Sequence, residues 1–320
     1  MGFAVKRVHA ATRSITRSVG GTASVLSVPI SLGQPFLGPD RSPGMLMDKG
    51  LIKMLAGCGW RVKILPEISS NDAAVKENQL NAKNCELVGE TCERIYKVVS
   101  DIARSDNFLL ILGGDHCIPI GTIPGIVAAR PSTGVVWVDA HADINTPATS
   151  SSGNMHGMPL GFLLGLVDNV STYPSLQWFK PCLNPKDIVY IGLRDLDGPE
   201  KMAIKRLGIK AFTMYDVDKL GIGKVMEQTC DHLSKHQNLH LSYDIDALDP
   251  FFAPSTGTAV RGGLTFREGN FICEYLAESG KLSSMELVEV NPSLHSDMDS
   301  KQTVEMALTL IGSAMGQKIL

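Results

Sequence analysis

Short apolar runs alternate with amphipathic stretches along most of the chain, and this alternation restricts the possible folds more than any other feature. Runs rich in β-branched residues are typical of strands covered on both faces, and the stretches between them have helical spacing. The expected strands are Ser24–Pro29, Arg61–Leu65, Phe108–Leu112, Gly134–Asp139, Asp187–Leu193, Ala211–Met214, Leu239–Asp246 and Met285–Val290. The pattern predicts an α/β fold in which crossover helices join parallel strands. No composition break or repeat follows residue 23, so we expect residues 24–320 to form a single domain.

Capping and terminating residues mark several helices. Ser42 followed by Pro43 predicts a helix that begins with a capping serine and runs to about Ala56, before Gly57. An apolar residue at every third or fourth position predicts another helix; these residues are Val88, Cys92, Ile95, Val99 and Ile102. Further helices are expected at Lys224–His236, Arg267–Ser279 and Thr303–Met315.

Five apolar runs end in acidic residues or histidines. The endings are Gly113–His116, Asp139–Asp143, Arg194–Asp197, Asp244–Asp246 and Glu289. In open α/β sheets, ligand crevices form at the carboxyl ends of the strands. We therefore expect the functional site at this edge of the sheet.

Six of these side chains have the chemistry of metal ligands. They are His116, Asp139, His141, Asp143, Asp244 and Asp246. An extended backbone would send residues spaced by two to the same side, which predicts that Asp139, His141 and Asp143 converge. Four carboxylates and two imidazoles exceed the four ligands of a structural zinc site, and oxygen-rich ligation suits a hard ion such as Mn²⁺. Two divalent ions would also offset the repulsion among the carboxylates.

Composition excludes several classes of partner. The formal net charge is −3, which gives no reason to expect binding to nucleic acid or to an anionic membrane. No apolar run approaches the roughly 18–20 residues that cross a bilayer. The seven cysteines are scattered and form no CxxC, which favours a reducing compartment. Cys117 follows a motif histidine, but we interpret it as a small buried side chain rather than a reactive thiol.

The amino terminus differs in composition from the rest of the chain. No acidic residue precedes Asp40, and the segment carries Lys6, Arg7, Arg13 and Arg17 among serines and threonines. This pattern predicts that residues 1–23 are a mitochondrial transit peptide. The alternative is a disordered basic tail on a cytoplasmic protein.

Three motifs resemble the signatures of the ureohydrolase family. They are Gly113–His116, Val138–Asp143 and Ser242–Pro250, and the resemblance extends from about Ser24 to the end of the chain. It implies a three-layer α/β/α sandwich with an eight-stranded, mostly parallel sheet and two Mn²⁺ ions per subunit. By resemblance, one ion would be held by His116, Asp139, Asp143 and Asp244, and the other by Asp139, His141, Asp244 and Asp246.

The loop after the metal motif is similar to that of the arginase branch of this family, and the pattern is nearest to mitochondrial-type animal arginases. The resemblance implies hydrolysis of L-arginine to L-ornithine and urea by a hydroxide that bridges the metals. Asn145, Ser152 and Asn154 would bind the α-carboxylate of arginine, and Asp197 and Glu200 its α-ammonium. A ureohydrolase for another guanidino compound such as agmatine, or a non-catalytic metal- or arginine-binding protein, remains as an alternative.

Further roles follow from the same resemblance. Glu289 would grip the guanidinium group, Thr258 would line the pocket, and His141 would contact substrate as well as metal. Asp143 and His156 would transfer protons. Glu286 lies on the opposite side of its strand from Glu289 and is expected to be solvated.

Two other expectations concern a departure from the family pattern and the assembly. Arg261 stands where the family has a small apolar residue, close to the pocket threonine. A homotrimer is the assembly that the resemblance implies.

Overall fold

The computed structural model describes residues 20–70 and 81–317. In this part of the chain, eight strands form one sheet with the order β2-β1-β3-β8-β7-β4-β5-β6. Every pairing is parallel. The strands are β1 (Thr22–Val28), β2 (Arg61–Ile64), β3 (Phe108–Gly113), β4 (Thr133–Val138), β5 (Ile188–Leu193), β6 (Lys210–Thr213), β7 (Asn238–Asp244) and β8 (Leu282–Val288). The eight expected strands are all present, and the sheet is wholly parallel.

Helices lie between most of the strands. They are α1 (Ser42–Asp48), α2 (Leu51–Gly57), α3 (Cys85–Ile102), α4 (Pro119–Ala129), α5 (Pro159–Leu163), α6 (Gly198–Leu207), α7 (Met214–Leu220), α8 (Ile222–His232), α9 (Phe266–Glu278) and α10 (Asp297–Ala314). None of the helices in the described ranges combines the length and hydrophobicity that a membrane span requires.

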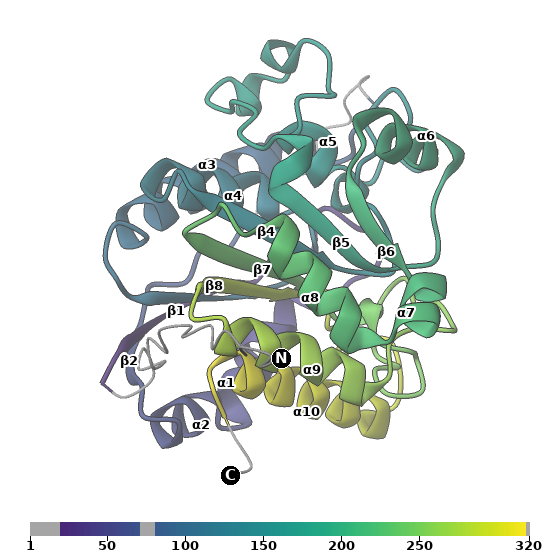
Figure 1. Ribbon diagram of the computed structural model, residues 1–320. Helices are drawn as coiled ribbons and strands as arrows, with labels where there is room; N and C mark the ends of the chain where they lie inside the picture. Colours follow the sequence, from purple (N-terminus) through teal and green to yellow (C-terminus); the bar gives the residue numbers. More distant parts are fainter. Residues whose placement is uncertain (1–19, 71–80, 318–320) are drawn as a thin grey trace, which may run out of the picture.

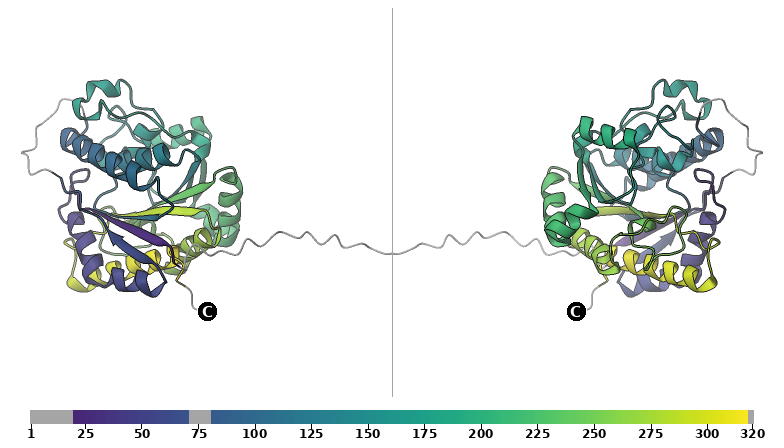
Figure 2. Two further views of the ribbon diagram at one scale, coloured as in Figure 1. Left: turned by 90° about the vertical axis from the view of Figure 1, so that its left-hand side faces the viewer. Right: turned by 90° about the vertical axis from the view of Figure 1, so that its right-hand side faces the viewer.

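The helices cover both faces of the sheet. Figure 1 shows α3, α4 and α5 on one side of the strands and α8, α9 and α10 on the other, and the side views of Figure 2 show the same three layers. An apolar cluster fills each interface between a helical layer and the sheet. Every residue of β3, β4 and β5 is buried, which explains their continuous apolar sequences. The α/β/α prediction is confirmed.

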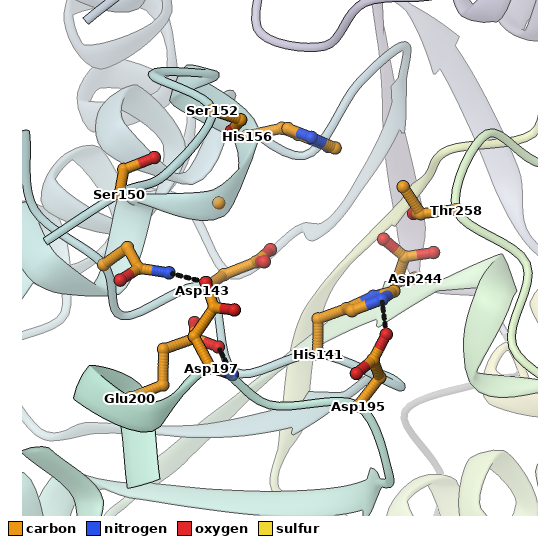
Figure 3. A pocket seen from close by; sticks show the side chains of 12 residues that line it. His141, Asp143, Ser150, Ser152, His156, Asp195, Asp197, Glu200, Asp244 and Thr258 are labelled. Atoms are coloured by element: carbon orange, nitrogen blue, oxygen red, sulfur yellow. Dashed lines mark hydrogen bonds and ion pairs between the residues drawn. The ribbon is translucent and has the colours of Figure 1, made fainter. Parts of the chain in front are cut away.

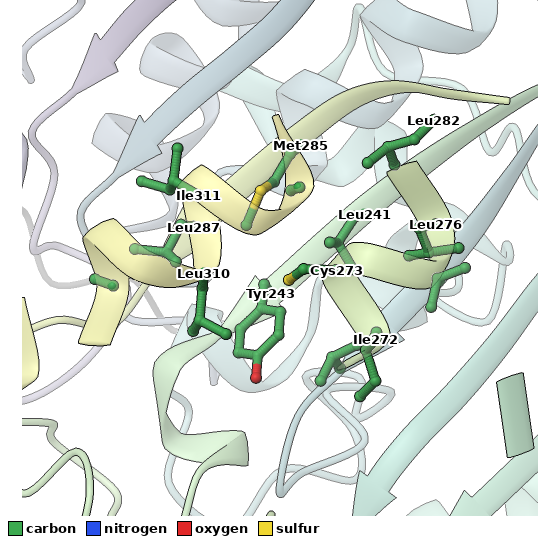
Figure 4. Packing of buried hydrophobic residues seen from close by; sticks show 14 of the residues in the cluster. Leu241, Tyr243, Ile272, Cys273, Leu276, Leu282, Met285, Leu287, Leu310 and Ile311 are labelled. Atoms are coloured by element: carbon green, nitrogen blue, oxygen red, sulfur yellow. The ribbon is translucent and has the colours of Figure 1, made fainter. Parts of the chain in front are cut away.

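Successive side chains of β7 point to opposite faces of the sheet, apolar side chains to one face and polar side chains to the other. Leu241 and Tyr243 pack with Met285 of β8 against α9 and α10 (Figure 4). His240 and Ser242 therefore point to the opposite face of the sheet. There His240 contacts Ser284 and Glu286, and Ser242 contacts His116.

The strand order brings the candidate site residues together. The four adjacent strands β3, β8, β7 and β4 lead into His116, Glu289, Asp244 and Asp139, respectively. Because all four strands run in the same direction, their carboxyl ends meet at one edge of the sheet. Such an edge is the usual place for a crevice in a parallel α/β sheet.

The expected helix from Ser42 to Ala56 is two helices. Gly50 separates α1 from α2 with a left-handed φ of 94°. Ser42 is the first residue of α1 rather than its cap, and its buried hydroxyl has no hydrogen-bond partner among the described residues. Arg41 occupies the capping position instead. The serine–proline pattern therefore gave the start of the helix but assigned the wrong capping residue.

Other boundaries differ by a few residues. The last helix, α10, begins at Asp297, six residues before the expected Thr303, because Ser296 and Asp299 form a reciprocal capping box. At the amino terminus, β1 already includes Thr22 and Ala23, which pair with Arg61 and Val62. Most of the proposed transit segment, residues 1–19, lies outside the described residues.

Candidate active site

Three carboxylates converge on one nitrogen of His116. His116 Nδ1 lies 3.2 Å from Asp139 Oδ2, 3.1 Å from Asp143 Oδ2 and 3.2 Å from Asp244 Oδ2. The same nitrogen is buried and has no hydrogen-bond partner in the described structure. The other ring nitrogen, Nε2, lies 2.9 Å from Ser242 Oγ, and the ring stacks on Trp137. These contacts fix the orientation of the imidazole, with Nδ1 facing the carboxylates.

A second group of ligand-type side chains adjoins the first. His141 Nδ1 lies 3.0 Å from Asp246 Oδ2 and 3.5 Å from Asp139 Oδ1. Asp139, His141 and Asp246 could hold one ion, and His116, Asp139 and Asp244 could hold another. Asp139 is therefore shared by the two groups, whereas Asp244 belongs only to the first.

The side chains converge for a different reason from the one predicted. The strand β4 ends at Val138, and Asp143 has a left-handed backbone with φ 49°. Similarly, β7 ends at Asp244, and Asp246 lies in a 3-10 helix, Ile245–Ala247. The alternation of an extended strand is thus interrupted in both motifs, and the turns after the strands orient the carboxylates.

Glu289 also has an unusual backbone. Its φ is 63°, and its amide N–H donates to the carbonyl of Gly114. The Oε1 atom accepts a hydrogen bond from the backbone N–H of His116 at 2.8 Å and lies 3.1 Å from His156 Nδ1. Left-handed backbone at non-glycine residues is concentrated at functional sites. Asp143 and Glu289, both expected to take part in catalysis, fit that pattern.

A cavity opens above the ligand groups (Figure 3). Its lining residues are His141, Asp143, Asn145, Ser150, Ser152, His156, Gly157, Asp195, Asp197, Glu200, Asp244 and Thr258. Asn145 Nδ2 donates to Asp197 Oδ2 at 3.1 Å, so a donor and an acceptor lie side by side on the wall. Thr258 Oγ1 donates to Asp246 Oδ2 at 3.0 Å.

Two predicted substrate residues, Asn154 and Glu289, lie outside the described lining. Asn154 Oδ1 accepts a hydrogen bond from Lys83 Nζ at 3.3 Å, and Asn154 is not among the described residues that line the cavity. Arg261 is exposed and is likewise absent from the described lining. The described lining therefore contains most of the predicted substrate residues, but it lacks Asn154 and Glu289, and it lacks Arg261 as well.

Sequence reasoning did not single out several residues that shape the site. Ser150 and Asp195 line the cavity, and His141 Nε2 lies 4.0 Å from Asp195 Oδ2. Trp137 Nε1 donates to Asp139 Oδ2 at 2.9 Å. Asp195 belongs to the polar segment Arg194–Asp197, and Ser150 lies in the loop after Asp143, so position alone could have indicated them. No sequence signal marks the indole of Trp137, which lies in an apolar strand.

Burial shifts the pKa of the acidic groups. Burial and the nearby charge of Asp139 raise the pKa of Asp143 to about 6, and burial raises that of Asp244 well above its usual range. Burial, supported by the charge of Asp143, raises the pKa of Glu200 to about 7. Burial opposes the charged form of His156, but Glu289 outweighs it and raises the His156 pKa to about 9. These carboxylates thus repel one another strongly enough that cations would be favoured among them.

The expectation that Glu286 is solvated is wrong. Glu286 is fully buried, accepts a hydrogen bond from Thr122 Oγ1 at 2.6 Å and lies 3.1 Å from His240 Nε2. Its strand β8 is covered on both faces, so the side opposite Glu289 also faces protein. By contrast, Cys117 is buried as expected, and burial raises the pKa of its thiol well above the usual value.

Comparison with known proteins assigns the chain to a family. The model of the arginase family matches residues 22–316. The chain is 46% identical to the hepatic arginase of Aquarana catesbeiana over 305 residues, which cover 94% of this chain and 93% of that protein. It is 44% identical to the human protein named arginase-2, mitochondrial, over 97% of this chain and 88% of the relative.

The chain belongs to the arginase family. A structural comparison agrees: the crystal structure of Entamoeba histolytica arginase in complex with L-ornithine has a TM-score of 0.85 and 32% identity, with 93% of this chain and 99% of that one covered. The family is metal-dependent, and the donor set of this chain suits a metal. A buried imidazole nitrogen without a hydrogen-bond partner faces three carboxylate oxygens, an arrangement that a cation would complete.

Proposed function

We propose that this member of the arginase family hydrolyses L-arginine to L-ornithine and urea with two Mn²⁺ ions. The observation that carries the proposal is the pair of ligand groups that share Asp139 at the base of an acidic cavity. The Entamoeba relative was crystallised with L-ornithine, which would be the product of this reaction.

Six side chains would hold the metals. His116, Asp139, Asp143 and Asp244 would hold one ion, and Asp139, His141, Asp244 and Asp246 the other. Oxygen-rich ligation with two imidazoles suits Mn²⁺. When bound, such ions supply Lewis acidity, which makes water a nucleophile at neutral pH.

The cavity wall is complementary to an amino-acid substrate. The Asn145 amide and the Ser152 hydroxyl can donate hydrogen bonds to an α-carboxylate. Asp197 lies beside Asn145 and can accept from an α-ammonium, while the Glu200 carboxylate accepts the backbone N–H groups of Asp197 and Ile144 and supports that wall. Adjacent donors and acceptors favour a zwitterionic head group over agmatine, which has no carboxylate.

Glu289 and His156 provide for the guanidinium group and for protons. The Glu289 carboxylate accepts from the His116 backbone N–H and lies 3.1 Å from His156 Nδ1, outside the described cavity lining. Its proposed role is to bind the guanidinium by charge-assisted hydrogen bonds. Because Glu289 raises the pKa of His156, the imidazole is protonated at neutral pH in this geometry. It can relay protons between the site and solvent, since its side chain is 16% exposed. Asp143 lies beside His116 and lines the cavity, where it can accept the proton lost by the attacking water and pass it to the departing amine.

Urea release from L-arginine and from agmatine tests the proposal directly. The Mn²⁺-loaded protein should turn over arginine with a much higher kcat/KM than agmatine. Faster turnover of agmatine would establish the alternative substrate class instead. Full metal loading without urea from either compound would indicate a non-catalytic binding protein.

We also propose a mitochondrial location and a trimeric assembly. The acid-free basic amino terminus and the name of the human relative support the first, and the family pattern supports the second. Amino-terminal sequencing of protein recovered from cells would contradict transit processing if Met1 is intact. Light scattering after size-exclusion chromatography would contradict the trimer if it gives the 34.5 kDa monomer mass.

A further inference from the structure

Arg194 has an unusual concentration of hydrogen bonds to backbone carbonyls. Its guanidinium donates to the carbonyls of five residues at distances from 2.6 to 3.3 Å. These residues are Gly192, Asp246, Ala247, Leu248 and Val260. Three of these carbonyls lie in the turn that follows β7, and within residues 20–70 and 81–317 the guanidinium forms no ion pair with a carboxylate of the ligand groups. Its hydrogen bonds therefore act on the backbone that carries the ligands.

Three of the five carbonyls, those of Asp246, Ala247 and Leu248, belong to the turn that carries Asp246 of the second ligand group. The shortest bond, at 2.6 Å, is to the carbonyl of Asp246, which is itself one of the ligand-type residues. Two further bonds hold Val260, two residues after Thr258, whose hydroxyl donates to Asp246 Oδ2. The guanidinium thus joins the turn of Asp246 to the loop that carries the pocket threonine.

The backbone of Arg194 contacts the segment that carries the other two members of this group, Asp139 and His141. Its N–H donates to the carbonyl of Ala140 at 2.9 Å, and Ala140 lies between Asp139 and His141. In return, the N–H of Ala140 donates to Asp246 Oδ1 at 3.2 Å. Arg194 is therefore hydrogen-bonded to the segments that carry Asp139, His141 and Asp246.

We propose that Arg194 is a positioning residue that holds Asp139, His141 and Asp246 in the geometry needed to bind one of the two metal ions. The ion bound around His116 shares Asp139 but depends on Arg194 less, because Ser242 holds His116 and Asp244 is the last residue of β7. The inference rests on the proposed two-metal site. Lysine cannot replace Arg194 in this role, since a single ammonium cannot reach carbonyls on three sides as a planar fork does.

Arg130 provides a matched control at the opposite edge of the sheet. Its guanidinium also donates to backbone carbonyls, those of Ala103, Ser105, Asn107 and Ser283, at distances from 2.7 to 3.1 Å. Arg130 precedes β4, and its partners lie before or at the starts of β3 and β8. Replacing it removes a comparable number of backbone bonds far from the candidate site.

Titration of the metal-free proteins with MnCl₂ in a calorimeter tests the inference. Wild type and Arg130→Met should each bind two ions. In Arg194→Met the first ion should bind as in wild type and the second about 10–100-fold more weakly, the usual effect of losing an outer-sphere partner of a metal ligand. At two equivalents, electron paramagnetic resonance should show a coupled pair in wild type and isolated Mn²⁺ in Arg194→Met. Arg194→Lys should also lower the affinity for the second ion. This variant decides the question if Arg194→Met does not fold.

Three results would overturn the inference. Arg194→Met and Arg194→Lys could bind both ions with wild-type affinity, which would leave Arg194 no positioning role. Arg130→Met could lose the second ion equally, which would make the effect one of general stability. Wild type could bind fewer than two ions, which would overturn the proposed two-metal function as well.

Discussion

At the scale of single residues, the site depends on backbone conformations that are costly for the chain. Asp143 and Glu289 both have positive φ, which costs on the order of 1–3 kcal/mol for a non-glycine residue. Each is held by a tertiary backbone bond: the Asp143 carbonyl accepts from Leu160, and the Glu289 N–H donates to Gly114. The surrounding fold thus stabilises a local geometry that neither segment would prefer by itself.

Glu286 should contribute strongly to stability. Burial works against its charge, but His240 and Thr122 outweigh burial and lower the pKa of the carboxyl group. Glu286→Gln removes the charge without leaving a cavity, and it should lower the free energy of unfolding by about 3–5 kcal/mol, as when one partner of a buried pair is lost. Chemical denaturation of the metal-loaded protein measures the change.

The exposed pair Arg267–Glu274 is the matched control for this prediction. Its side chains are 65% and 35% exposed. Glu274→Gln should change the free energy of unfolding by no more than about 1 kcal/mol, because exposed ion pairs contribute little. An equal loss of unfolding free energy in Glu286→Gln and Glu274→Gln would contradict the importance assigned to the buried carboxylate.

The raised pKa of Glu200 predicts a pH dependence of stability in the metal-free protein. Its pKa rises from 4.5 to about 7 in the folded state, chiefly through burial. Between these values the unfolded chain releases the proton while the folded chain keeps it, so rising pH favours unfolding. The wild-type free energy of unfolding, relative to that of Glu200→Gln, should therefore fall by about 3 kcal/mol from pH 4.5 to pH 7. A flat difference between the two proteins over this range would show that the carboxyl group is not shifted.

At the scale of elements, glycine conformation decides where the first helical segment is divided. Gly50 separates α1 from α2 in a left-handed conformation, whereas Gly44 lies inside α1. An added Cβ would meet no atom within 4 Å at either position, so only the backbone conformation distinguishes them. The two glycines therefore provide a test of backbone conformation without steric contacts.

Alanine substitutions at these two glycines should have opposite effects. Gly50→Ala should lower the free energy of unfolding by about 1–2 kcal/mol, because an L side chain is strained in a left-handed backbone. Gly44→Ala should raise it by about 0.5–1 kcal/mol, because alanine loses less entropy in a helix. Thermal unfolding of both variants provides the comparison. A stabilised Gly50→Ala would indicate that α1 and α2 can form one continuous helix.

At the scale of the whole molecule, the buried acidic cluster couples metal binding to folding. Asp139, Asp143, Asp244 and Asp246 are each at most 7% exposed, so their charges are poorly screened by solvent. The cluster lies where the four central strands meet. Its electrostatic repulsion therefore acts on the sheet itself and not on a peripheral loop.

Removal of metal should destabilise the protein and abolish urea production together. Each occupied site adds about 2.7 kcal/mol to the free energy of unfolding when free metal is 100 times Kd. Chelation should therefore lower the Tm markedly, and added Mn²⁺ should restore both Tm and activity. A Tm unaffected by chelation would mean that the carboxylates are accommodated without cations.

The sequence alone determined the strands, the sheet class and the edge of the sheet at which the candidate site lies. It could do so because buried parallel strands require continuous apolar runs, and because each such run leads directly into its functional residues. Element boundaries were less accurate, since caps such as Ser296 and turns such as Gly50 depend on a few local contacts.

Only the tertiary structure decided how the site residues meet. Strands β3, β8, β7 and β4 are separated in sequence but adjacent in the sheet. Contacts between distant segments also determine three features of single residues. They are the left-handed backbone of Asp143, the buried partners of Glu286 and the carbonyls around Arg194. A sequence pattern within one segment does not show which distant segments it contacts. These features could therefore be identified only from the tertiary structure.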